Sequence, residues 1–334
     1  MKLAVATLAL LPLVPFAVTA RHVAPPVKVT VEEWTVPWER TRPRDPYPDA
    51  KGRIWFVGQV GNYIATFDTA TKQFRRWEID AGTHPHNLIV DRAGMVWYAG
   101  NRNGMIGRLD PATGAITRYP MPDGEVRDPH TLVQDAAGTI WFTAQQASHV
   151  GRLDPKTGEV RLVRVEPRTA RPYGIVVAPS GHPWFAPFGA NRLVRVDPGT
   201  MALTDFPLPD AATRVRRLEV TRDGMVWYAD YTRGMLGRLD PATGATKEWA
   251  LPGGVRAFPY AMARDHRDRL WMVETGANPN RLVGFDPRTQ EWLAPVPIAK
   301  SGALSVRHMV FHAPTREIWF GTDANTLGRA RITE

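Results

Sequence analysis

Apolar residues in this chain fall in short runs of four to six positions that are rich in Val, Ile, Leu and aromatic side chains. Each run is bounded by Asp, Gly or Pro, and the stretch 130–163 contains four of them in succession. Runs of this length and composition, separated by turn residues, predict short β-strands joined by hairpins. The chain after about residue 30 is therefore expected to be all-β.

One phrase recurs along the chain: an apolar residue or proline, then tryptophan, then an aromatic residue or Met. Its tryptophans are spaced 42 to 48 residues apart and are Trp55, Trp97, Trp141, Trp184, Trp227, Trp271 and Trp319. A period of about 40–50 residues made of strands and turns is typical of a β-propeller. We predict a seven-bladed β-propeller of four-stranded antiparallel blades. Because each blade packs only against its neighbours, residues 31–334 should form a single domain.

The two ends of the chain predict how the ring closes. The last repeat finishes at 327–332, in its third strand, and no fourth strand follows. Residues 31–36 resemble the fourth strand of other repeats, such as 115–119. We expect this N-terminal strand to complete the last blade, which leaves no exposed edge in the ring.

The first 20 residues have the pattern of a signal peptide. Lys2 precedes an almost wholly apolar stretch from Leu3 to Val18, and small residues up to Ala20 favour cleavage after that position. An uncleaved membrane anchor is disfavoured because the stretch is short and contains Pro12 and Pro15. We expect a periplasmic or secreted protein with a flexible leader at 21–30 and no stable membrane insertion after cleavage.

Composition narrows the chemistry. The chain has no cysteine, which excludes disulfides, thiolate nucleophiles and Cys-held metals. Its formal net charge of +9 favours an anionic partner, although a solvated basic surface remains an alternative. No nucleic-acid motif is present, so nucleic acid is not an expected partner. We expect a monomer that binds a small, anionic molecule.

Two repeated features are assigned to structure rather than to function. The tryptophans occur in every repeat, which indicates packing between blades. Asp-Pro-x-Thr-Gly recurs at 110–114, 154–158 and 240–244. In such a turn the Asp side chain bonds backbone amides ahead of it, Pro presets the φ angle and Gly accepts positive φ.

Positions that vary between repeats are the candidate site. The residue eleven before each tryptophan should open the innermost strand, and from the second repeat onward these residues are His86, His130, Tyr173, Arg216, Tyr260 and His308. Arg171 and Arg307 flank them. Polar side chains that converge on one end of the central channel predict a ligand-binding site. The alternative is that they are hydrogen-bonded plugs that hold the strand starts together.

A second variable position follows each tryptophan by three residues. It is acidic at Asp230 and Glu274, and Asp323 stands one residue further on in the last repeat. Carboxylates near the channel could bind a divalent ion or act as a general base beside His308. No metal-binding spacing such as His-Glu-x-x-His supports a metal site.

The repeat phrase resembles that of a known family. An inner-strand start such as Arg-Pro-Tyr-Gly-Ile (171–175), Trp-Phe-Thr (141–143) and Val/Ile-Gly-Arg-Leu-Asp (150–154 and 106–110) are similar to the virginiamycin B lyase, or streptogramin lyase, family. The resemblance implies a seven-bladed propeller whose characterised members open a macrocyclic depsipeptide antibiotic. They eliminate across the ester C–O bond with Mg²⁺, while a general base removes the α-proton.

The family pattern is only partly kept. It places histidines at the inner-strand starts of the last two blades, a glutamate two residues before the final histidine, and another after the final Trp-Phe. His308 matches the final histidine, whereas Tyr260 replaces the other, Val306 stands at the first glutamate and Asp323 is the stand-in for the second. With Val306 in place, Mg²⁺ affinity is expected to fall sharply.

Two functional hypotheses follow. The first is an exported C–O lyase that opens an ester or cyclic depsipeptide, with His308 as base; on a streptogramin, this activity would give antibiotic resistance. The second is a non-catalytic propeller that binds a ligand or a protein segment and has lost the metal site. A calcium-dependent lactonase propeller shares the architecture, but no motif in the chain favours it.

Overall fold

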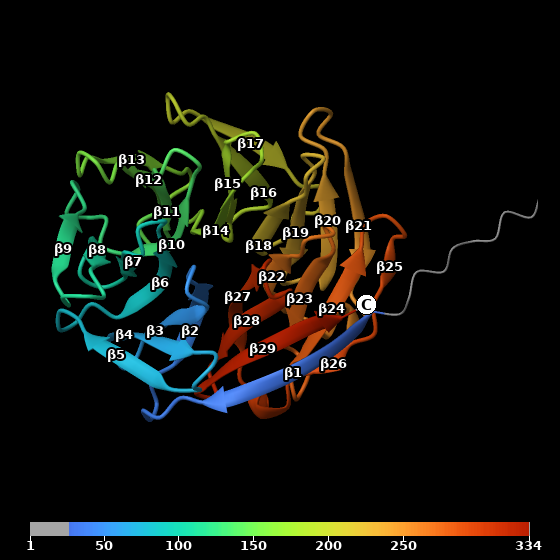
Figure 1. Ribbon diagram of the computed structural model, residues 1–334. Helices are drawn as coiled ribbons and strands as arrows, with labels where there is room; N and C mark the ends of the chain where they lie inside the picture. The colour runs from blue at the N-terminus through green and yellow to red at the C-terminus, as the bar shows by residue number, and fades with distance from the viewer. Residues whose placement is uncertain (1–26, 334) are drawn as a thin grey trace, which may run out of the picture.

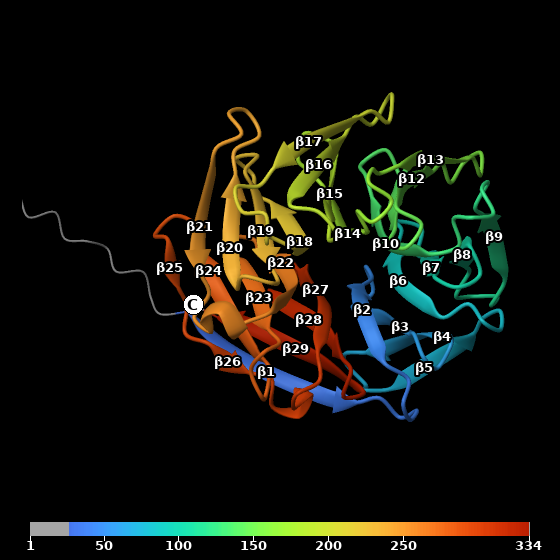
Figure 2. The same cartoon turned by 180° about the vertical axis from the view of Figure 1, so that it is seen from behind.

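The computed structural model describes residues 27–333 and places them in a closed ring of seven antiparallel sheets (Figure 1). The view from behind shows the same ring (Figure 2). This confirms the predicted all-β, seven-bladed propeller. The proposed signal peptide and residues 21–26 of the leader lie outside the described residues. No helix within residues 27–333 is long and apolar enough to cross a membrane.

Each blade follows the chain from the channel outward, since the first strands of neighbouring blades contact one another around the axis. Blade 1 contains β2 (Pro43–Pro48), β3 (Arg53–Gly58), β4 (Tyr63–Asp68) and β5 (Phe74–Glu78). Blade 2 contains β6 (Pro85–Val90), β7 (Val96–Gly100), β8 (Met105–Leu109) and β9 (Ile116–Pro120). Blade 3 contains β10 (Pro129–Gln134), β11 (Ile140–Ala144), β12 (His149–Leu153) and β13 (Val160–Arg164).

The next three blades repeat this order. Blade 4 contains β14 (Pro172–Val177), β15 (Pro183–Pro187), β16 (Arg192–Val196) and β17 (Leu203–Pro207). Blade 5 contains β18 (Val215–Val220), β19 (Val226–Asp230), β20 (Met235–Leu239) and β21 (Thr246–Ala250). Blade 6 contains β22 (Pro259–Arg264), β23 (Leu270–Glu274), β24 (Arg281–Asp286), β25 (Glu291–Trp292) and β26 (Val296–Pro297), with the short 3₁₀ helices η1 (Gly254–Arg256) before it and η2 (Ala299–Ser301) after it.

Blade 7 joins the two ends of the chain. It contains β27 (Val306–His312), β28 (Glu317–Thr322), β29 (Thr326–Thr333) and the N-terminal strand β1 (Lys28–Thr35). β1 pairs with β29 over eight residues, from Lys28 opposite Thr333 to Thr35 opposite Thr326. The predicted closure is confirmed, and the strand starts at Lys28 rather than at the expected Val31. The N-terminal and C-terminal strands are thereby hydrogen-bonded to each other, which closes the ring.

The tryptophans are buried between sheets, where each one lies on the second strand of its blade. In four blades the indole Nε1 donates to an aspartate six residues earlier, at 2.8–2.9 Å for Asp49, Asp91, Asp135 and Asp265. The same carboxylate accepts backbone amides of its hairpin, as Asp91 does from Ala93 and Met95. One side chain therefore closes the turn and orients the indole. Sequence reasoning missed this pairing.

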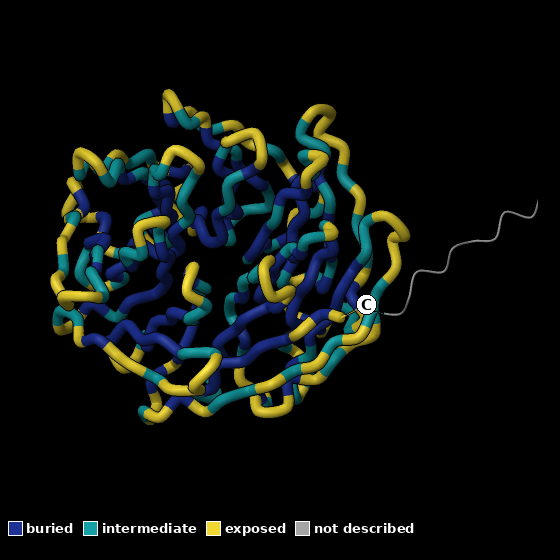
Figure 3. Tube along the Cα trace, in the orientation of Figure 1, coloured by how far each residue is buried: buried dark blue, intermediate teal, exposed yellow. Residues whose placement is uncertain are grey.

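The Asp-Pro-x-Thr-Gly turns have the predicted structural role. The Asp110 carboxylate accepts the Ala112 amide at 2.8 Å, and the Gly114 amide donates to the Asp110 carbonyl at 2.8 Å. Gly114 has φ +77°, the left-handed region that glycine tolerates best. Figure 3 shows the burial that results: the strands around the channel are buried, and exposed residues gather in loops and along the outer strands.

Candidate functional site

Strand pairing defines which residue of each blade faces its counterparts around the channel. In blade 2, Leu88 pairs with Tyr98, the residue after the tryptophan, and His86 lies two positions before Leu88. The same rule gives one residue per blade, which we call the channel ring: Arg44, His86, His130, Tyr173, Arg216, Tyr260 and Arg307. The ring thus takes one side chain from every blade.

The last blade departs from the sequence prediction. Met309 pairs with Phe320, so Arg307, not His308, occupies the ring position. The β27–β28 hairpin is one residue longer than its counterparts, and a fixed offset of eleven from Trp319 therefore points one residue too far. His308 lies one residue deeper along the inner strand than the ring.

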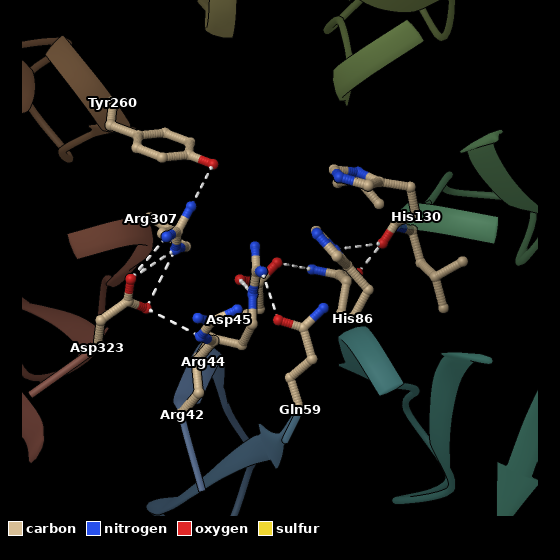
Figure 4. Close-up of polar contacts among 12 residues, drawn as sticks. Arg42, Arg44, Asp45, Gln59, His86, His130, Tyr260, Arg307 and Asp323 are labelled. Atoms are coloured by element: carbon tan, nitrogen blue, oxygen red, sulfur yellow. Dashed lines mark hydrogen bonds and ion pairs between the residues drawn. The ribbon is translucent and has the colours of Figure 1, made fainter. Parts of the chain in front are cut away.

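On one side of the channel, tyrosines and arginines form a connected group. The Tyr260 hydroxyl accepts a hydrogen bond from Arg307 Nη1 at 3.1 Å and lies 3.4 Å from Arg216 Nη1. It also shares a hydrogen bond with the Tyr173 hydroxyl. Arg307 is held by the Asp323 carboxylate through Nε at 2.9 and 3.0 Å and Nη2 at 2.6 Å (Figure 4). Two guanidinium groups are therefore aimed at one phenolic oxygen.

This arrangement moves the pKa values of the two tyrosines apart. Burial alone would raise the pKa of Tyr260, but the positive charges of Arg216, Arg44 and Arg307 outweigh it and hold the pKa below the ordinary value of 10. Burial, with Tyr260 as its neighbour, raises the pKa of Tyr173 to about 12. Of the two hydroxyls, that of Tyr260 therefore ionises more readily than that of Tyr173.

The opposite side of the ring is built from two histidines whose rings are in contact at an interplanar angle of 34°. The rings of His86 and His130 lie 3.5 Å apart between centroids. Nδ1 of His86 is 3.0 Å from the His130 carbonyl oxygen (Figure 4). Nδ1 of His130 is 2.9 Å from the Thr131 hydroxyl. Burial, reinforced by nearby arginines, holds both pKa values well below 6.5. These imidazoles are neutral side chains in a packed wall.

A second layer lies directly below the ring, and sequence reasoning missed most of it. Asp45 is fully buried; its carboxylate accepts from Arg44 Nε at 3.0 Å and Asn87 Nδ2 at 2.9 Å, and lies 3.7 Å from Arg217 Nη2. Burial would raise the pKa of Asp45, but these arginines and His308 lower it far below its usual range. Asp45 directly follows the ring residue Arg44, which stands eleven residues before Trp55, so the regular repeat was the available signal for Asp45.

His308, the predicted base, sits in this second layer. Its Nδ1 is buried and has no hydrogen-bond partner within residues 27–333. Burial lowers the pKa of His308 to about 4, although the charge of Asp45 acts in the opposite direction. The imidazole is therefore neutral, and the strand register separates it from the tyrosine–arginine group.

The predicted metal ligands lie apart and are neutralised by other groups. Glu274 pairs with Arg281 and accepts the Gly253 amide at 2.7 Å, while Asp323 pairs with Arg307 and lies 3.6 Å from Arg42. Asp230 pairs with Arg233 at 3.3 Å. Among the described residues no group of three or more His, Asp or Glu is placed to hold a metal.

The position expected to carry a metal-binding glutamate also lacks a carboxylate. Val306 is fully buried in an apolar cluster between blades 6 and 7. By strand register, Ser305 rather than Val306 stands two residues before the ring. Neither side chain supplies the anionic oxygen that Mg²⁺ prefers. The residues present therefore do not fit the magnesium site that the family resemblance implies.

An aromatic wall borders the ring at blades 4 to 6, and sequence reasoning missed it. The Arg216 guanidinium lies 4.1 Å from the ring centroid of Phe188 and 4.3 Å from those of Tyr231 and Tyr260. Such contacts hold a guanidinium in place through the electron-rich ring faces.

Arg171, predicted to bind ligand, is exposed just before β14, and its carbonyl accepts the Phe188 amide at 3.0 Å.

The charges at this end of the channel do not cancel. Five guanidinium groups, those of Arg42, Arg44, Arg216, Arg217 and Arg307, share two carboxylates, Asp45 and Asp323. The set carries three positive charges in excess. Fixed guanidinium groups in a poorly solvated channel stabilise an anion, or negative charge that develops during a reaction.

Comparisons with known proteins agree with this architecture. A virginiamycin B lyase from Staphylococcus aureus superposes with a TM-score of 0.82 at 20% identity, over 92% of this chain and 100% of that one. A catalytically inactive variant of that enzyme with quinupristin gives 0.82 at 21%, with the same coverage. A streptogramin B lyase gives 0.82 at 22%, over 91% of this chain and 98% of that one. At these identities the likeness shows the fold.

More distant propellers also match. The extracellular domain of a hybrid two component system from B. thetaiotaomicron gives a TM-score of 0.67 at 16% identity, over 87% of this chain and 40% of that one. No curated protein matches the sequence. The model of the virginiamycin B lyase family matches residues 92–334, which is more than two thirds of the chain. The chain therefore belongs to the virginiamycin B lyase family.

Proposed function

We propose that this protein is a carbon–oxygen lyase that opens an ester by β-elimination at the channel ring, with Tyr260 as the general base. The observation that carries the proposal is the Tyr260 hydroxyl, which Arg307 and Arg216 approach at 3.1 and 3.4 Å. Membership of the family supports the reaction class. In blade 6, Tyr260 stands at the inner-strand start, where the family pattern has a histidine.

Tyr260 can accept a proton because its anion is stabilised before substrate arrives. The guanidinium groups of Arg216 and Arg307 offset the cost of a buried phenolate, and the Tyr173 hydroxyl donates to the same oxygen. A base whose pKa is shifted toward the working pH is more effective in general catalysis. Neutral His86 and His130 on the far side add no competing positive charge.

The proposed step balances without a metal. The Tyr260 phenolate takes the α-proton, the electron pair of that C–H bond forms a C=C bond, and the Cβ–O bond breaks toward oxygen. The leaving group departs as a carboxylate, so one negative charge moves from the phenolate to the product. The excess guanidinium charge at the ring stabilises that carboxylate as it forms. A cyclic depsipeptide is opened by the same step.

The test is turnover of ester substrates, with quinupristin as the first probe. Elimination should be followed by the absorbance of the new double bond and by mass spectrometry, which distinguishes it from hydrolysis by the 18 Da of water. Tyr260→Phe should lower the rate about 100-fold or more, the usual scale for loss of a general base. Tyr119→Phe, a change of the same kind on the outer strand β9, is the control.

The metal-free step gives a second expectation. EDTA should leave the rate unchanged, because the described residues do not provide a carboxylate cluster for Mg²⁺. Loss of activity on chelation, restored by Mg²⁺, would contradict the proposed role of the arginines. Full activity of the Tyr260→Phe variant would remove Tyr260 from the mechanism.

The second candidate is a propeller that binds an anionic small molecule without reacting with it. The lack of a carboxylate at Val306 and the pairing of Asp323 with Arg307 favour this candidate, because the remaining arginine ring would still hold a carboxylate ligand. It predicts calorimetric binding of quinupristin's ring-opened acid, or of simpler carboxylates, with no turnover of any ester. Binding should weaken in Arg307→Gln and at high salt.

We also propose that the protein is exported to the periplasm or the medium. The basic start and apolar stretch of residues 1–20 support this, and one propeller of similar fold is an extracellular domain. Expression of the full chain in a Gram-negative host and intact-mass measurement should give a mature form that starts at Arg21. A full-length mass confined to the cytosol would contradict export.

A further inference from the structure

A cavity of about 270 Å³ lies beyond the second layer, among the C-terminal halves of the inner strands. We call it the far cavity. It is bordered by residues of β6, β10, β14, β18, β22 and β27, all of them later in these strands than the ring residues. It is therefore separate from the tyrosine–arginine group. Its volume lies just below the range of about 300–1,000 Å³ usual for small-molecule sites, which suits a compact ligand.

Three polar side chains that border the far cavity have unused hydrogen-bonding groups. Glu219 makes no hydrogen bond or ion pair within the part of the chain that the structure describes, while Arg264 Nε and His308 Nδ1 are buried without a partner. Buried polar groups in folded proteins are nearly always paired, and each exception asks for an explanation. The two buried exceptions, Arg264 Nε and His308 Nδ1, border the same cavity as the half-buried Glu219 carboxylate, and together they point to a missing ligand.

Two oppositely charged side chains border the far cavity without forming an ion pair with each other. Glu219 lies on β18 and Arg264 on the neighbouring inner strand β22. Arg264 is anchored through Nη1 by Asp268, which leaves its Nε edge free. Glu219 and Arg264 interact electrostatically without contact, and burial raises the pKa of Glu219 to about 7. A molecule that carries both charges would bridge them.

Of the other polar side chains that line the cavity, Tyr47, Asn87, Thr131 and Gln134, the last three have hydrogen-bond partners within the protein. The remaining lining is apolar. It includes Ile89, Val133, Val176 and Val310, with Phe311 at one edge. An apolar wall favours a hydrocarbon group and would penalise a ligand that is charged throughout. The lining thus combines one acid, one guanidinium edge and a hydrophobic wall.

We propose that the far cavity is a second binding site, which takes a small zwitterion with an aliphatic body, of the class of the free α-amino acids. The ammonium group pairs with Glu219, the carboxylate accepts from Arg264 Nε, and the aliphatic side chain lies against Val133 and Val176. His308 offers a neutral imidazole to either polar end. The proposal stands independently of the lyase reaction proposed for the channel ring.

The test is isothermal titration calorimetry on the mature protein with three probes: L-leucine, L-leucine methyl ester and N-acetyl-L-leucine. The ester lacks the carboxylate and the acetyl compound lacks the ammonium group. L-leucine should bind, and each blocked compound should bind at least about tenfold more weakly, the scale of one lost charge contact. Equal binding of all three, or no binding of L-leucine, would overturn the proposal.

Substitutions of Glu219 and Arg264 test which side chain contacts each charged end of the ligand. Glu219→Gln should weaken L-leucine at least about tenfold and leave N-acetyl-L-leucine unchanged, whereas Arg264→Lys should act on the probes with a carboxylate. Glu78→Gln, on the exposed edge of β5, is the matched control. Tyr260→Phe should leave L-leucine affinity unchanged, which separates this site from the ring.

Thermal melting of the wild type gives a second measurement that does not depend on whether a variant folds. L-leucine should raise the melting temperature of the wild type, and its methyl ester should not, a comparison that needs no variant. If Glu219→Gln does not fold, Glu219→Asp keeps the charge but shortens its reach and should reduce the shift. An equal shift in Glu219→Asp, Glu219→Gln and wild type would contradict the assignment.

Discussion

The outer framework of the blades and the channel ring follow opposite rules. In the framework the same contact recurs: a tryptophan donates to an aspartate six residues earlier in blades 1, 2, 3 and 6, and Trp227 uses Thr221 in the same way. In the ring the seven positions carry arginine, histidine or tyrosine, and no one residue type recurs in all blades. Repetition marks what every blade needs for folding, whereas variation marks the residues that serve one site.

The two regions also differ in how their polar groups are satisfied. Framework aspartates accept up to four hydrogen bonds, as Asp265 does from its hairpin amides, Arg269 and Trp271. Around the ring, Arg44 Nη2, Arg216 Nε and Arg217 Nε are buried without partners, whereas among the seven repeat tryptophans only the Nε1 of Trp319 is among the buried, unpartnered atoms of the described residues. Buried donors without a partner cost stability, and packing in the surrounding blades offsets that cost. Stability measurements on variants from both regions test this contrast.

The largest effect is expected in the framework. Trp271 is fully buried and packs in the cluster between blades 6 and 7, so Trp271→Ala should lower the free energy of unfolding by about 3–5 kcal/mol. Tyr260→Phe in the ring should cost only about 1 kcal/mol, the scale of one net hydrogen bond. Urea denaturation followed by fluorescence measures both. A ring variant as damaging as the framework variant would erase the distinction.

The pH dependence of stability should report the uncharged histidine below the ring. The folded pKa of His308 is about 4 against an ordinary 6.5, so its contribution is fully present above pH 6.5 and is lost as the pH falls to 4. His308→Gln should reduce the loss of stability over this window by about 2–3 kcal/mol. Melting scans from pH 4 to 8 test this.

Glu219 gives the internal control, because its shift has the opposite sign. Its folded pKa of about 7 lies above the ordinary value of 4.5. Its contribution is therefore complete below pH 4.5 and is lost as the pH rises through 7. Glu219→Gln should stabilise the protein at pH 8 relative to pH 5. Identical pH profiles for both variants and the wild type would show that neither group is buried as the structure indicates.

The smallest effect is expected at the rim. The side chain of Arg42 is 43% exposed and lies 3.6 Å from Asp323, so Arg42→Gln should change the free energy of unfolding by no more than about 0.5 kcal/mol. Its charge still adds to the field of the ring and should raise the affinity for carboxylate ligands at low salt. That difference should vanish above about 0.5 M salt. A large loss of stability would make Arg42 part of the framework.

The site could be predicted only as far as the repeat stays regular. Tyr173, Arg216 and Tyr260 come together where the tryptophan spacing placed them, since blades 4 to 6 keep the same inner hairpin length. The β27–β28 hairpin has one extra residue, so the ring position of the last blade holds Arg307 instead of the predicted His308. Asp45 follows Arg44 directly, and Phe188 and Tyr231 each stand four residues after a tryptophan. They were missed because the residue type at these positions changes from blade to blade.

The amino-acid sequence by itself determined the number of blades, the strand that closes the ring and the hairpin turns. These depend on local patterns: short apolar runs, turn residues and the period of the tryptophans. Tertiary structure alone decided which polar side chains meet and what charge they carry. The pKa of Tyr260 depends on guanidinium groups from three other blades, and the burial of Asp45 exists only once the ring has closed. Electrostatic interactions between residues far apart in the chain leave no periodic signal in the sequence.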